Sequence, residues 1–527
     1  MRASNDALSV AVLAFFALAA SALFLDSVWS GGVSIDERAD FLVLGEQIRF
    51  ADNLLFDNRL FGLDGPPFTN GFHSIANDYE YYGIGTYLPA GVVYYLTSVL
   101  WLGLEPKYSE SFSFALHILA FISALAATWY TGNLVYVASH DREVSILAAL
   151  ALLVTPTWLG YSFIDYKDVP IAAGLIATVY YSAAIIKNPT SRSSVFFFAA
   201  LLFLGSQKIA ALALALPACM AVAWVVVQHR SMRLLVNFAG LATGFLILLY
   251  IITPPSWQEP VEFVVSSVTY MSQHAWRGCT LTSGECIGPF FNAGVGYSAA
   301  KYLGLWYAVK LPLLLQIGLV AATIFYLVHV HEVPPVVHLI VASLFWPIVA
   351  MILRNATLYD GIRHTLFVMP LAVSFVFVSL PEGLFKKWRL AVVLYAAFLL
   401  IDMARLQPYG HIWFNEWARF SVSERNYAMT HWGYPTREAI NLSLVLQKPN
   451  EWIVGGPGHL AELFVKNRFA YTVEMVPKGN NYLLVQLGIW DEKAFPGCRR
   501  VGEVTRRQVF APRPLRLAFV ARCKRES

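Results

Sequence analysis

Long apolar segments alternate with short polar connections over the first four hundred residues of this chain. A helix that crosses a bilayer needs about 20 predominantly apolar residues. On that basis we predict about eleven spans, which are 7–27, 111–135, 144–160, 169–186, 194–206, 209–228, 234–253, 305–328, 335–353, 364–381 and 388–404. Pro89 and several tyrosines and glycines interrupt the apolar segment 87–102, which we expect to lie at the interface. The pattern predicts an α-helical polytopic membrane protein.

The pattern changes after Ala404, where acidic and basic residues become frequent. Alternating runs at Tyr482–Leu487 and Leu517–Val520 predict strands, and Arg437–Leu446 predicts a helix. We therefore expect a small soluble C-terminal α/β domain. The predicted domains are a transmembrane domain at 1–405, with outer loops 28–110 and 254–304, and the C-terminal domain at 406–527.

Basic residues indicate the orientation. The connections Lys187–Arg192, Arg230–Arg233 and Lys386–Arg389 are short and basic, so they are assigned to the cytoplasm. If 87–102 does not cross, all three fall on one side together with the N-terminus. The outer loops and the C-terminal domain then face the opposite compartment.

Composition agrees with a membrane protein, since 57% of the residues are hydrophobic and 14% charged. The net charge of +4 comes without a basic run, which argues against nucleic acid as a partner. No phosphate-binding glycine motif is present, so the sequence gives no indication of a nucleotide-binding loop. The cysteines allow the disulfides Cys279–Cys286 and Cys498–Cys523, with Cys219 free, or four ordinary thiols.

Charged residues gather where predicted spans end. Asp36 and Glu37 lie within about ten residues of the first span, where desolvating a carboxylate is costly. The other groups are Asp165, Lys167 and Asp168 in SFIDYKDVP, Lys208, and Arg354, Asp360, Arg363 and His364 in RNATLYDGIRH. Singly, these residues would serve as helix caps or interfacial anchors. Together, mixed charges on one membrane face favour a reaction chamber.

Carboxylates beside cations suit the transfer of a group from a lipid-linked phosphate to a hydroxyl. A carboxylate can take the proton of the attacking hydroxyl. Arginine and lysine can stabilise the departing phosphate. A lipid-linked donor also explains why the chamber lies at the bilayer and why the chain has no nucleotide-binding loop.

Four segments carry a resemblance to a known family: IDERADF, FIDYKDVPIAA, LYDGIRHTLFVMP, and QPYGHIWFNEW with HWGYPTREAI. The chain resembles the GT-C membrane glycosyltransferases, in the family 39-like branch of protein O-mannosyltransferases and bacterial aminoarabinose transferases. The resemblance implies an inverting glycosyltransferase of the bacterial inner membrane. Its donor would be a polyprenyl-phosphate-linked sugar, and its acceptor a hydroxyl of a glycan, lipid or protein on the extracytoplasmic face.

The resemblance also implies roles for the acidic residues. Asp36 would be the catalytic base, and Glu37 would support it or orient the acceptor. Asp168, with Lys167 beside it, would match the second acidic position of the family, and Asp165 is the competing choice.

The remaining candidates would bind the donor. Arg363 and His364 would lie near its phosphate, with Arg354 or Lys208 as alternatives, and Asp360 belongs to the same segment. No cofactor is assigned. A divalent metal stays open because members of the family differ in metal use.

Two other functions are compatible with this sequence. A transporter or flippase of lipid-linked saccharide should carry polar residues along its spans and show inverted repeats. A membrane scaffold with a partner-binding C-terminal domain would leave Asp36, Asp168 and Arg363 unexplained. The polar residues here lie mainly at span ends, which favours the enzyme.

Overall fold

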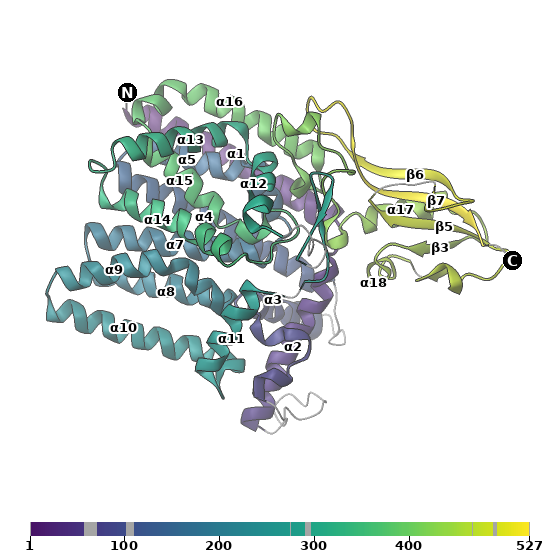
Figure 1. Cartoon of the computed structure of the whole chain (residues 1–527), viewed down its shortest axis with the longest axis horizontal. Coiled ribbons are helices and arrows are strands. Elements are labelled where there is room, and N and C mark those ends of the chain that lie inside the picture. Colours follow the sequence, from purple (N-terminus) through teal and green to yellow (C-terminus); the bar gives the residue numbers. More distant parts are fainter. Residues whose placement is uncertain are drawn as a thin grey trace.

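The computed structural model of the chain describes residues 2–56, 71–101, 110–274, 276–289, 297–465, 467–488 and 493–525. Figure 1 shows a bundle of helices with a small sheet at one end. The helices up to residue 406 are α1 Arg2–Ser30, α2 Ile35–Phe56, α3 Tyr87–Tyr94, α4 Glu110–Ser139, α5 Arg142–Val154, α6 Pro156–Ser162, α7 Asp168–Lys187, α8 Ser191–Gln207, α9 Leu216–Gln228, α10 Met232–Ile251, α11 Pro260–Ser272, α12 Ala299–Lys310, α13 Leu313–Val328, α14 Pro335–Leu353, α15 Val368–Ser379 and α16 Glu382–Leu406.

Six helices in the described part of the chain are long and apolar enough to cross a membrane. They are Leu8–Ser30, Phe112–Ser139, Asp168–Lys187, Ile209–Gln228, Met232–Ile251 and Pro335–Leu353, and each coincides with a predicted span. The Asp168–Lys187 segment is 78% buried, whereas Met232–Ile251 is 11% buried. α7 therefore lies at the centre of the bundle and α10 at its periphery, as Figure 1 shows. The predicted helical polytopic class is confirmed.

Three of the predicted spans are interrupted in the structure. The segment 144–160 forms α5 and α6, which are bent by 63°. Pro156 causes the bend because proline disfavours a helical conformation in the residue before it, and Thr155 is extended with ψ 112°. The segment 305–328 breaks before α13 at Pro312, and 364–381 forms α15 only after a 3₁₀ turn at Arg363–Thr365. Breaks of this kind leave room for polar side chains at helix ends.

The apolar segment 87–102 forms α3, which continues as a π-helix over Tyr95–Trp101. Its place at the interface, like the count of about eleven spans, stays a prediction. The predicted outer loops are described only in part, since 57–70, 102–109, 275 and 290–296 lie outside the described residues. Within them, α2 runs across the end of the bundle helices (Figure 1).

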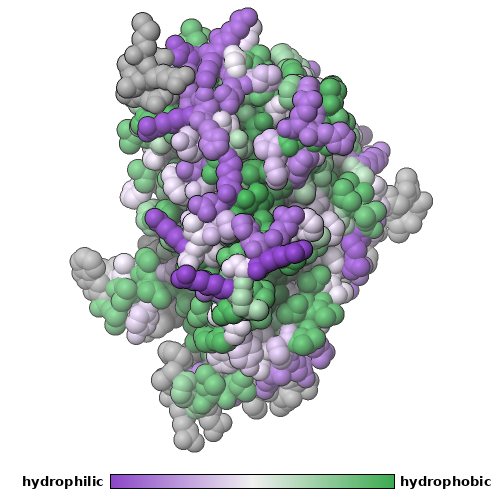
Figure 2. All heavy atoms as spheres, turned by 90° about the vertical axis from the view of Figure 1, so that its left-hand side faces the viewer, coloured by the Kyte–Doolittle hydropathy of each residue, from purple (hydrophilic) through white to green (hydrophobic). Residues whose placement is uncertain are grey.

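The connections assigned to the cytoplasm lie at the end of the bundle away from the sheet, and two of them contact the start of α5 (Figure 1). Lys187 Nζ lies 2.6 Å from His140 Nε2, and Lys386 forms an ion pair with Asp141. Arg389 pairs with Glu143 of the same turn at 3.3 Å. Figure 2 views the molecule from this end, which carries the N-terminus in Figure 1, and hydrophilic side chains gather over it among hydrophobic ones.

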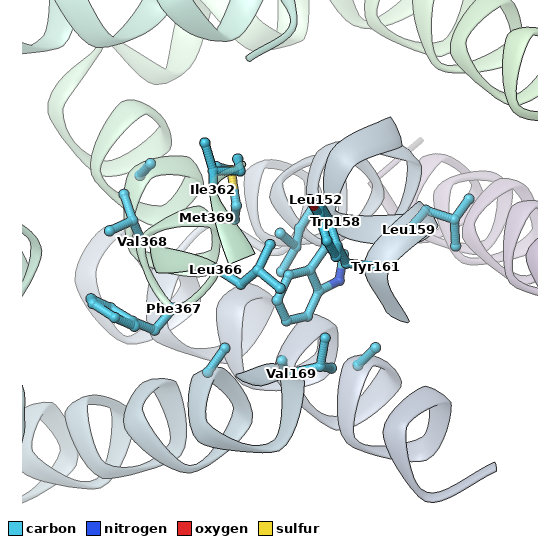
Figure 3. Close-up of a cluster of buried hydrophobic side chains, with 14 of the residues drawn as sticks. Leu152, Trp158, Leu159, Tyr161, Val169, Ile362, Leu366, Phe367, Val368 and Met369 are labelled. Atoms are coloured by element: carbon cyan, nitrogen blue, oxygen red, sulfur yellow. The ribbon is translucent and has the colours of Figure 1, made fainter. Parts of the chain in front are cut away.

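An apolar cluster holds α6, the start of α7 and the residues before α15 together. Trp158 and Tyr161 of α6 are buried, as are Leu366 and Met369. Figure 3 shows the Trp158 ring close to Leu366, with Val169 of α7 beneath it. Close packing of this kind fixes the positions of neighbouring backbone segments. The polar residues just outside this cluster, Asp165 to Asp168 and Arg363, are therefore held on rigid supports.

The C-terminal domain contains a five-stranded sheet with strand order β4-β3-β5-β7-β6. Its elements are α17 Thr436–Leu446, β3 Trp452–Gly455, α18 Gly458–Ala461, β4 Phe469–Ala470, β5 Asn481–Leu487, β6 Arg499–Arg506 and β7 Leu515–Lys524. β3 is parallel to β4 and β5, and β7 is antiparallel to β5 and β6. α17 packs on β5, β6 and β7. The predicted α/β character, the two predicted strands and the predicted helix are confirmed.

Buried charges connect the bundle to the segment that follows it. Lys310 Nζ donates to the carbonyls of His411 at 2.9 Å and Trp413 at 2.7 Å. Asp402 Oδ2 of α16 accepts from Arg419 Nη2 at 2.8 Å and from Trp413 Nε1 at 2.7 Å. Because charged groups are costly to bury without partners, these contacts tie residues 410–419 to the bundle. The domain boundary after residue 405 stays a prediction.

Candidate active site

The first turn of α2 begins with a reciprocal capping box. Ser34 N donates to Glu37 Oε1 at 2.8 Å, and Glu37 N donates to Ser34 Oγ at 3.2 Å. This arrangement satisfies backbone donors that the helix itself leaves unpaired. Glu37 Oε1 also accepts from Tyr434 OH at 3.1 Å and lies 3.2 Å from His117 Nε2. Glu37 is fully buried, and these hydrogen bonds fix the start of the helix that carries Asp36.

The Glu37 carboxyl is ionised despite this burial. Burial raises its pKa, but interaction with His117 and hydrogen bonds from Ser113 and Ser34 outweigh that cost and lower the pKa below its ordinary value. Hydrogen bonds to the charged form have this effect in general. The structure therefore places Glu37 in a supporting hydrogen-bond cluster.

Asp36 lies one residue earlier and faces Lys167. Lys167 Nζ is 3.1 Å from Asp36 Oδ2 and 3.1 Å from Asp40 Oδ1, so one ammonium bridges two carboxylates of α2. Lys167 lowers the pKa of Asp36, more than burial raises it. Burial raises the pKa of Asp40, which also accepts hydrogen bonds from Tyr166 and Tyr87. Asp36 is the ionised carboxylate of this group that reaches the cavity described below.

The loop before α7 sets the orientation of Lys167 and Asp168. Asp165 Oδ1 accepts from the backbone N–H groups of both residues, at 3.1 Å and 2.9 Å. Asp168 Oδ1 lies 3.5 Å from Lys208 Nζ. Burial and the nearby Asp168 carboxylate raise the pKa of Asp165. The structure gives Asp165 a positioning contact and directs Asp168 toward a cation.

Two glycines dock a loop against the end of α8, next to Lys208. Gly83 N donates to Gln207 O at 2.9 Å, and Gly85 N donates to Ser206 O at 2.8 Å. A Cβ atom on Gly83 would lie 2.1 Å from Ser206 O, so a larger residue does not fit. The docked loop holds the Tyr82 ring 5.4 Å from Lys167 Nζ and 5.8 Å from Lys208 Nζ. Both distances suit cation–π attraction.

Arg363 lies between two aromatic rings. Its Cζ is 4.7 Å from the centre of the Tyr359 ring and 4.9 Å from that of Trp432. Its Nη2 lies 3.4 Å from Asp360 Oδ2, and its Nε donates to His364 Nε2 at 3.1 Å. Burial, followed by the charge of Arg363, lowers the pKa of His364 to about 3. His364 is therefore neutral near pH 7, and the Arg363 guanidinium is held in one orientation.

These side chains surround one cavity of about 190 Å³. Its polar lining residues are Asp36, Tyr82, Lys167, Asp168, Lys208, Tyr270, His274, Thr357, Tyr359, Arg363 and His364. Its apolar lining comes from Ile171, Ala210, Ala211, Leu214, Met271, Met351, Ala356, Leu358 and Phe367. The cavity thus joins a charged wall to the ends of candidate membrane helices.

The sequence candidates divide into two groups. The cavity is lined by Asp36, Lys167, Asp168, Lys208, Arg363 and His364. Glu37, Asp165 and Asp360 lie outside this lining and contact residues that belong to it or to its supports. Arg354 is exposed at the end of α14 and is not part of the lining.

The sequence interpretation missed several residues of the site. Asp40 is four residues after Asp36, so both carboxylates share one face of α2, and this spacing was an available signal. The Gly83-Ile84-Gly85 segment was a signal for a close backbone approach. No sequence feature near Trp432 predicted that its ring would pack on Arg363, because this contact joins two segments far apart in the chain.

Among the described residues, His73, Glu259 and Glu262 form the one group whose ligand atoms could hold a metal ion, all within 4.8 Å of one another. All three are exposed, and none lines the cavity. In the cavity itself, Asp36 and Asp168 each pair with a lysine. A metal ion there would compete with an ammonium for either carboxylate.

Of the two alternatives for the cysteines, the structure has the disulfides Cys279–Cys286 and Cys498–Cys523, and Cys219 is free. The first closes the hairpin of β1 Thr280–Thr282 and β2 Glu285–Ile287. Thr280 Oγ1 in this hairpin accepts from Asp360 N at 3.1 Å. The disulfide therefore braces the turn that precedes Arg363.

Comparisons with known proteins give a structural similarity alone. No family model matches the chain, and no curated protein matches it. The crystal structure of ArnT from Cupriavidus metallidurans in the apo state is similar with a TM-score of 0.47 and 12% identity, covering 97% of this chain and 98% of that chain. The crystal structure of the same protein bound to undecaprenyl phosphate has a TM-score of 0.46 and 12% identity, covering 96% of this chain and 97% of that chain.

Proposed function

We propose that this protein is an inverting glycosyltransferase that moves a sugar from a polyprenyl-phosphate-linked donor to a hydroxyl acceptor on the extracytoplasmic face of the membrane. One observation carries the proposal: a single cavity at the ends of membrane helices is lined by the Asp36 carboxylate, by Lys208 and Arg363, and by apolar side chains. The motif resemblance described above points to the same reaction.

Asp36 supplies the base in this mechanism. The acceptor hydroxyl attacks the anomeric carbon of the donor as its proton passes to the Asp36 carboxylate. The bond between the anomeric carbon and the phosphate oxygen breaks on the opposite face, so the configuration inverts. Lys167 lowers the pKa of Asp36 and so favours its ionised form, and Asp40 holds the Lys167 ammonium in place from its other side.

Arg363 and Lys208 bind the leaving phosphate. The phosphate gains negative charge as the sugar departs, and pre-oriented cations stabilise that charge in the transition state. Tyr359, Trp432 and Asp360 hold the Arg363 guanidinium, so little reorganisation is needed during the reaction. His364 is neutral at pH 7 and accepts a hydrogen bond from Arg363 Nε. It therefore orients Arg363 and adds no charge of its own next to the phosphate.

The apolar lining suits the lipid part of the donor. Ile171 belongs to α7 and Met351 to α14, which are both candidate membrane spans, and Leu214 belongs to the segment Ile209–Gln228. A polyprenyl chain in the bilayer would reach the cavity along these helices with its phosphate at the polar wall. Burial of apolar chain surface favours this arrangement.

The proposed orientation rests on the cysteines and the basic connections. Disulfides persist in oxidising compartments, and both disulfides lie in the segments assigned to the outer face. The basic connections lie at the other end of the bundle. We accordingly place the cavity and the C-terminal domain on the extracytoplasmic face of the bacterial inner membrane.

The test uses the purified full-length protein in detergent, a panel of radiolabelled polyprenyl-phosphate sugars, and membrane extract as the source of acceptor. Asp36→Asn should abolish transfer at unchanged folding. Asp26→Asn, which alters an exposed carboxylate of α1, should transfer like wild type. Equal turnover by Asp36→Asn and wild type would remove Asp36 from the mechanism.

A thermal-stability measurement with each donor separates a missing acceptor from a wrong function. Donor-dependent stabilisation without transfer would indicate that the extract lacks the acceptor. Folded protein that shows neither transfer nor stabilisation with any donor would contradict the proposal and favour a transporter of lipid-linked saccharide.

A further inference from the structure

The loop between β6 and β7 carries an aromatic side chain on the outside of the molecule. Phe510 is 78% exposed. Its backbone has φ +58°, a conformation that bulky residues rarely adopt. Phe510 belongs to neither of the hydrophobic clusters that include the residues of the sheet domain. The loop therefore presents the ring outside the core of that domain.

Phe510 reaches the side of α16. The Phe510 and Phe398 rings lie 6.2 Å apart with an interplanar angle of 18°. Phe398 comes eight residues before α16 ends at Leu406, which at the rise of an α-helix is about 12 Å along the axis. Figure 1 shows the β6–β7 connection, in yellow, extending from the sheet back to the end of α16. A loop of the C-terminal domain thus extends alongside a predicted membrane span.

The surface of α16 next to this loop is apolar and exposed. Leu390, Leu394 and Ile401 are exposed and lie at spacings that bring them to one face of the helix. Such a stripe on a predicted span faces lipid. Phe398, which the Phe510 ring contacts, lies four residues after Leu394 and three before Ile401 on the same helix. The ring is therefore adjacent to this stripe.

Arginines lie on either side of the aromatic tip. Arg507 and Arg513, each three residues from Phe510, are exposed, and so is Arg405 at the end of α16. Trp417 and Phe420, in the segment that follows α16, are also exposed. Aromatic rings beside arginines are typical of the interface between acyl chains and headgroups. A purely aqueous surface would not favour this combination.

We propose that the loop 507–514 is a membrane anchor of the C-terminal domain, in which Phe510 inserts at the acyl–headgroup boundary of the outer leaflet and Arg507 and Arg513 contact phospholipid phosphates. The anchor holds the sheet domain against the bilayer. The choice of the outer leaflet rests on the orientation given under Proposed function, whereas the insertion of the loop requires no particular enzymatic activity.

The test attaches a nitroxide spin label at position 510 in the full-length protein. The background is Cys219→Ala, with both disulfides kept, and the label is carried by Phe510→Cys. Two matched labels bracket it: Leu394→Cys on the exposed face of α16, and Lys478→Cys on an exposed part of the sheet domain. The proteins are reconstituted in vesicles of phosphatidylethanolamine and phosphatidylglycerol. Collision with oxygen reports lipid, and collision with a water-soluble nickel chelate reports solvent.

The proposal expects the oxygen-to-nickel ratio at position 510 to exceed that at position 478 several-fold and to approach that at position 394. A ratio at 510 equal to that at 478 would overturn it. Shielding of 510 from both reagents would also overturn it, since a second copy or a protein partner would then cover the loop. If Phe510→Cys does not elute as folded protein, Pro512→Cys takes its place, because Pro512 is exposed on the same loop and has no proposed phosphate contact.

Discussion

Tyr434 donates a hydrogen bond to Glu37 at 3.1 Å, although the two residues are 397 positions apart. Glu37 belongs to the capping box at the start of the helix that carries Asp36, and Tyr434 lies two residues after Trp432, which covers Arg363. One short segment before α17 therefore contacts supports on both sides of the cavity. The C-terminal part of the chain is structurally coupled to the proposed base and to the proposed phosphate ligand.

Tyr434→Phe should weaken this coupling while keeping the ring. The change removes one buried hydrogen bond to a charged group, which contributes on the order of 1.5–3 kcal/mol. We expect a lower thermal midpoint and a fall in kcat larger than any change in the donor KM, because Asp36 would be less well oriented. Thermal unfolding and steady-state kinetics of the same preparation check both effects. An unchanged kcat at a lowered midpoint would reduce Tyr434 to a purely structural role.

Lys167→Met should change the pH dependence of transfer. Lys167 lowers the pKa of Asp36 below its ordinary value, so the base stays ionised to low pH. Without the ammonium the pKa of Asp36 rises, and the acidic limb of kcat/KM should move to higher pH. The stabilising effect of the ion pair has the same sign: it is present above the unfolded-state pKa of Asp36 and is lost as the pH falls through the lower folded-state value.

The matched control for that pH profile is Lys301→Met. Lys301 is an exposed lysine that pairs with Glu285 at 2.9 Å, outside the cavity. Its profile should superimpose on that of wild type. An acidic limb that stays in place in Lys167→Met would show that Asp36 does not set it.

Arg363→Ala should weaken donor binding. Loss of a charge-assisted contact to phosphate costs about 1.5–3 kcal/mol, which corresponds to roughly 10- to 150-fold in the dissociation constant. Calorimetric titration with the polyprenyl-phosphate sugar measures it. Arg354→Ala removes an exposed arginine from the neighbouring helix end and should bind the donor like wild type. Equal donor affinity in both variants would exclude Arg363 as the phosphate ligand.

Much of the fold follows from local features of the sequence. Apolar length predicts the six long spans, and alternation predicts β5 and β7, because these signals depend on neighbouring residues. Pro156 and Pro312 were signals for the breaks in two predicted spans. Counting apolar residues did not detect these breaks, because the count does not depend on where prolines lie. The charge clusters at span ends located Asp36, Lys167, Asp168, Lys208 and Arg363 in advance.

The arrangement within the site depends on contacts between distant segments, which no local pattern contains. Asp36 and Glu37 are adjacent in sequence, but Asp36 lines the cavity and Glu37 is fully buried. The difference arises because the capping box directs Glu37 toward Tyr434 and His117. Arg354 and Arg363 look alike in sequence, yet only Arg363 is enclosed by Tyr359 and Trp432. Spacing could indicate which residues were candidates, and tertiary packing decided which of them reach the cavity.

Gly83→Ala tests whether the docked loop positions the site. A Cβ atom at this position would lie 2.1 Å from Ser206 O and 2.4 Å from Gln207 O, so the loop would have to move away from the end of α8. The movement would displace the Tyr82 ring from Lys167 and Lys208. We expect a destabilised protein in which donor binding falls as well.

Gly45→Ala in α2 is the matched control, because nothing lies within 4 Å of the added Cβ. That substitution should raise stability by about 0.5–1 kcal/mol, as alanine does in a helix interior, and leave transfer unchanged. If Gly83→Ala binds donor and transfers sugar as Gly45→Ala does, the contact between this loop and α8 does not position the lysines.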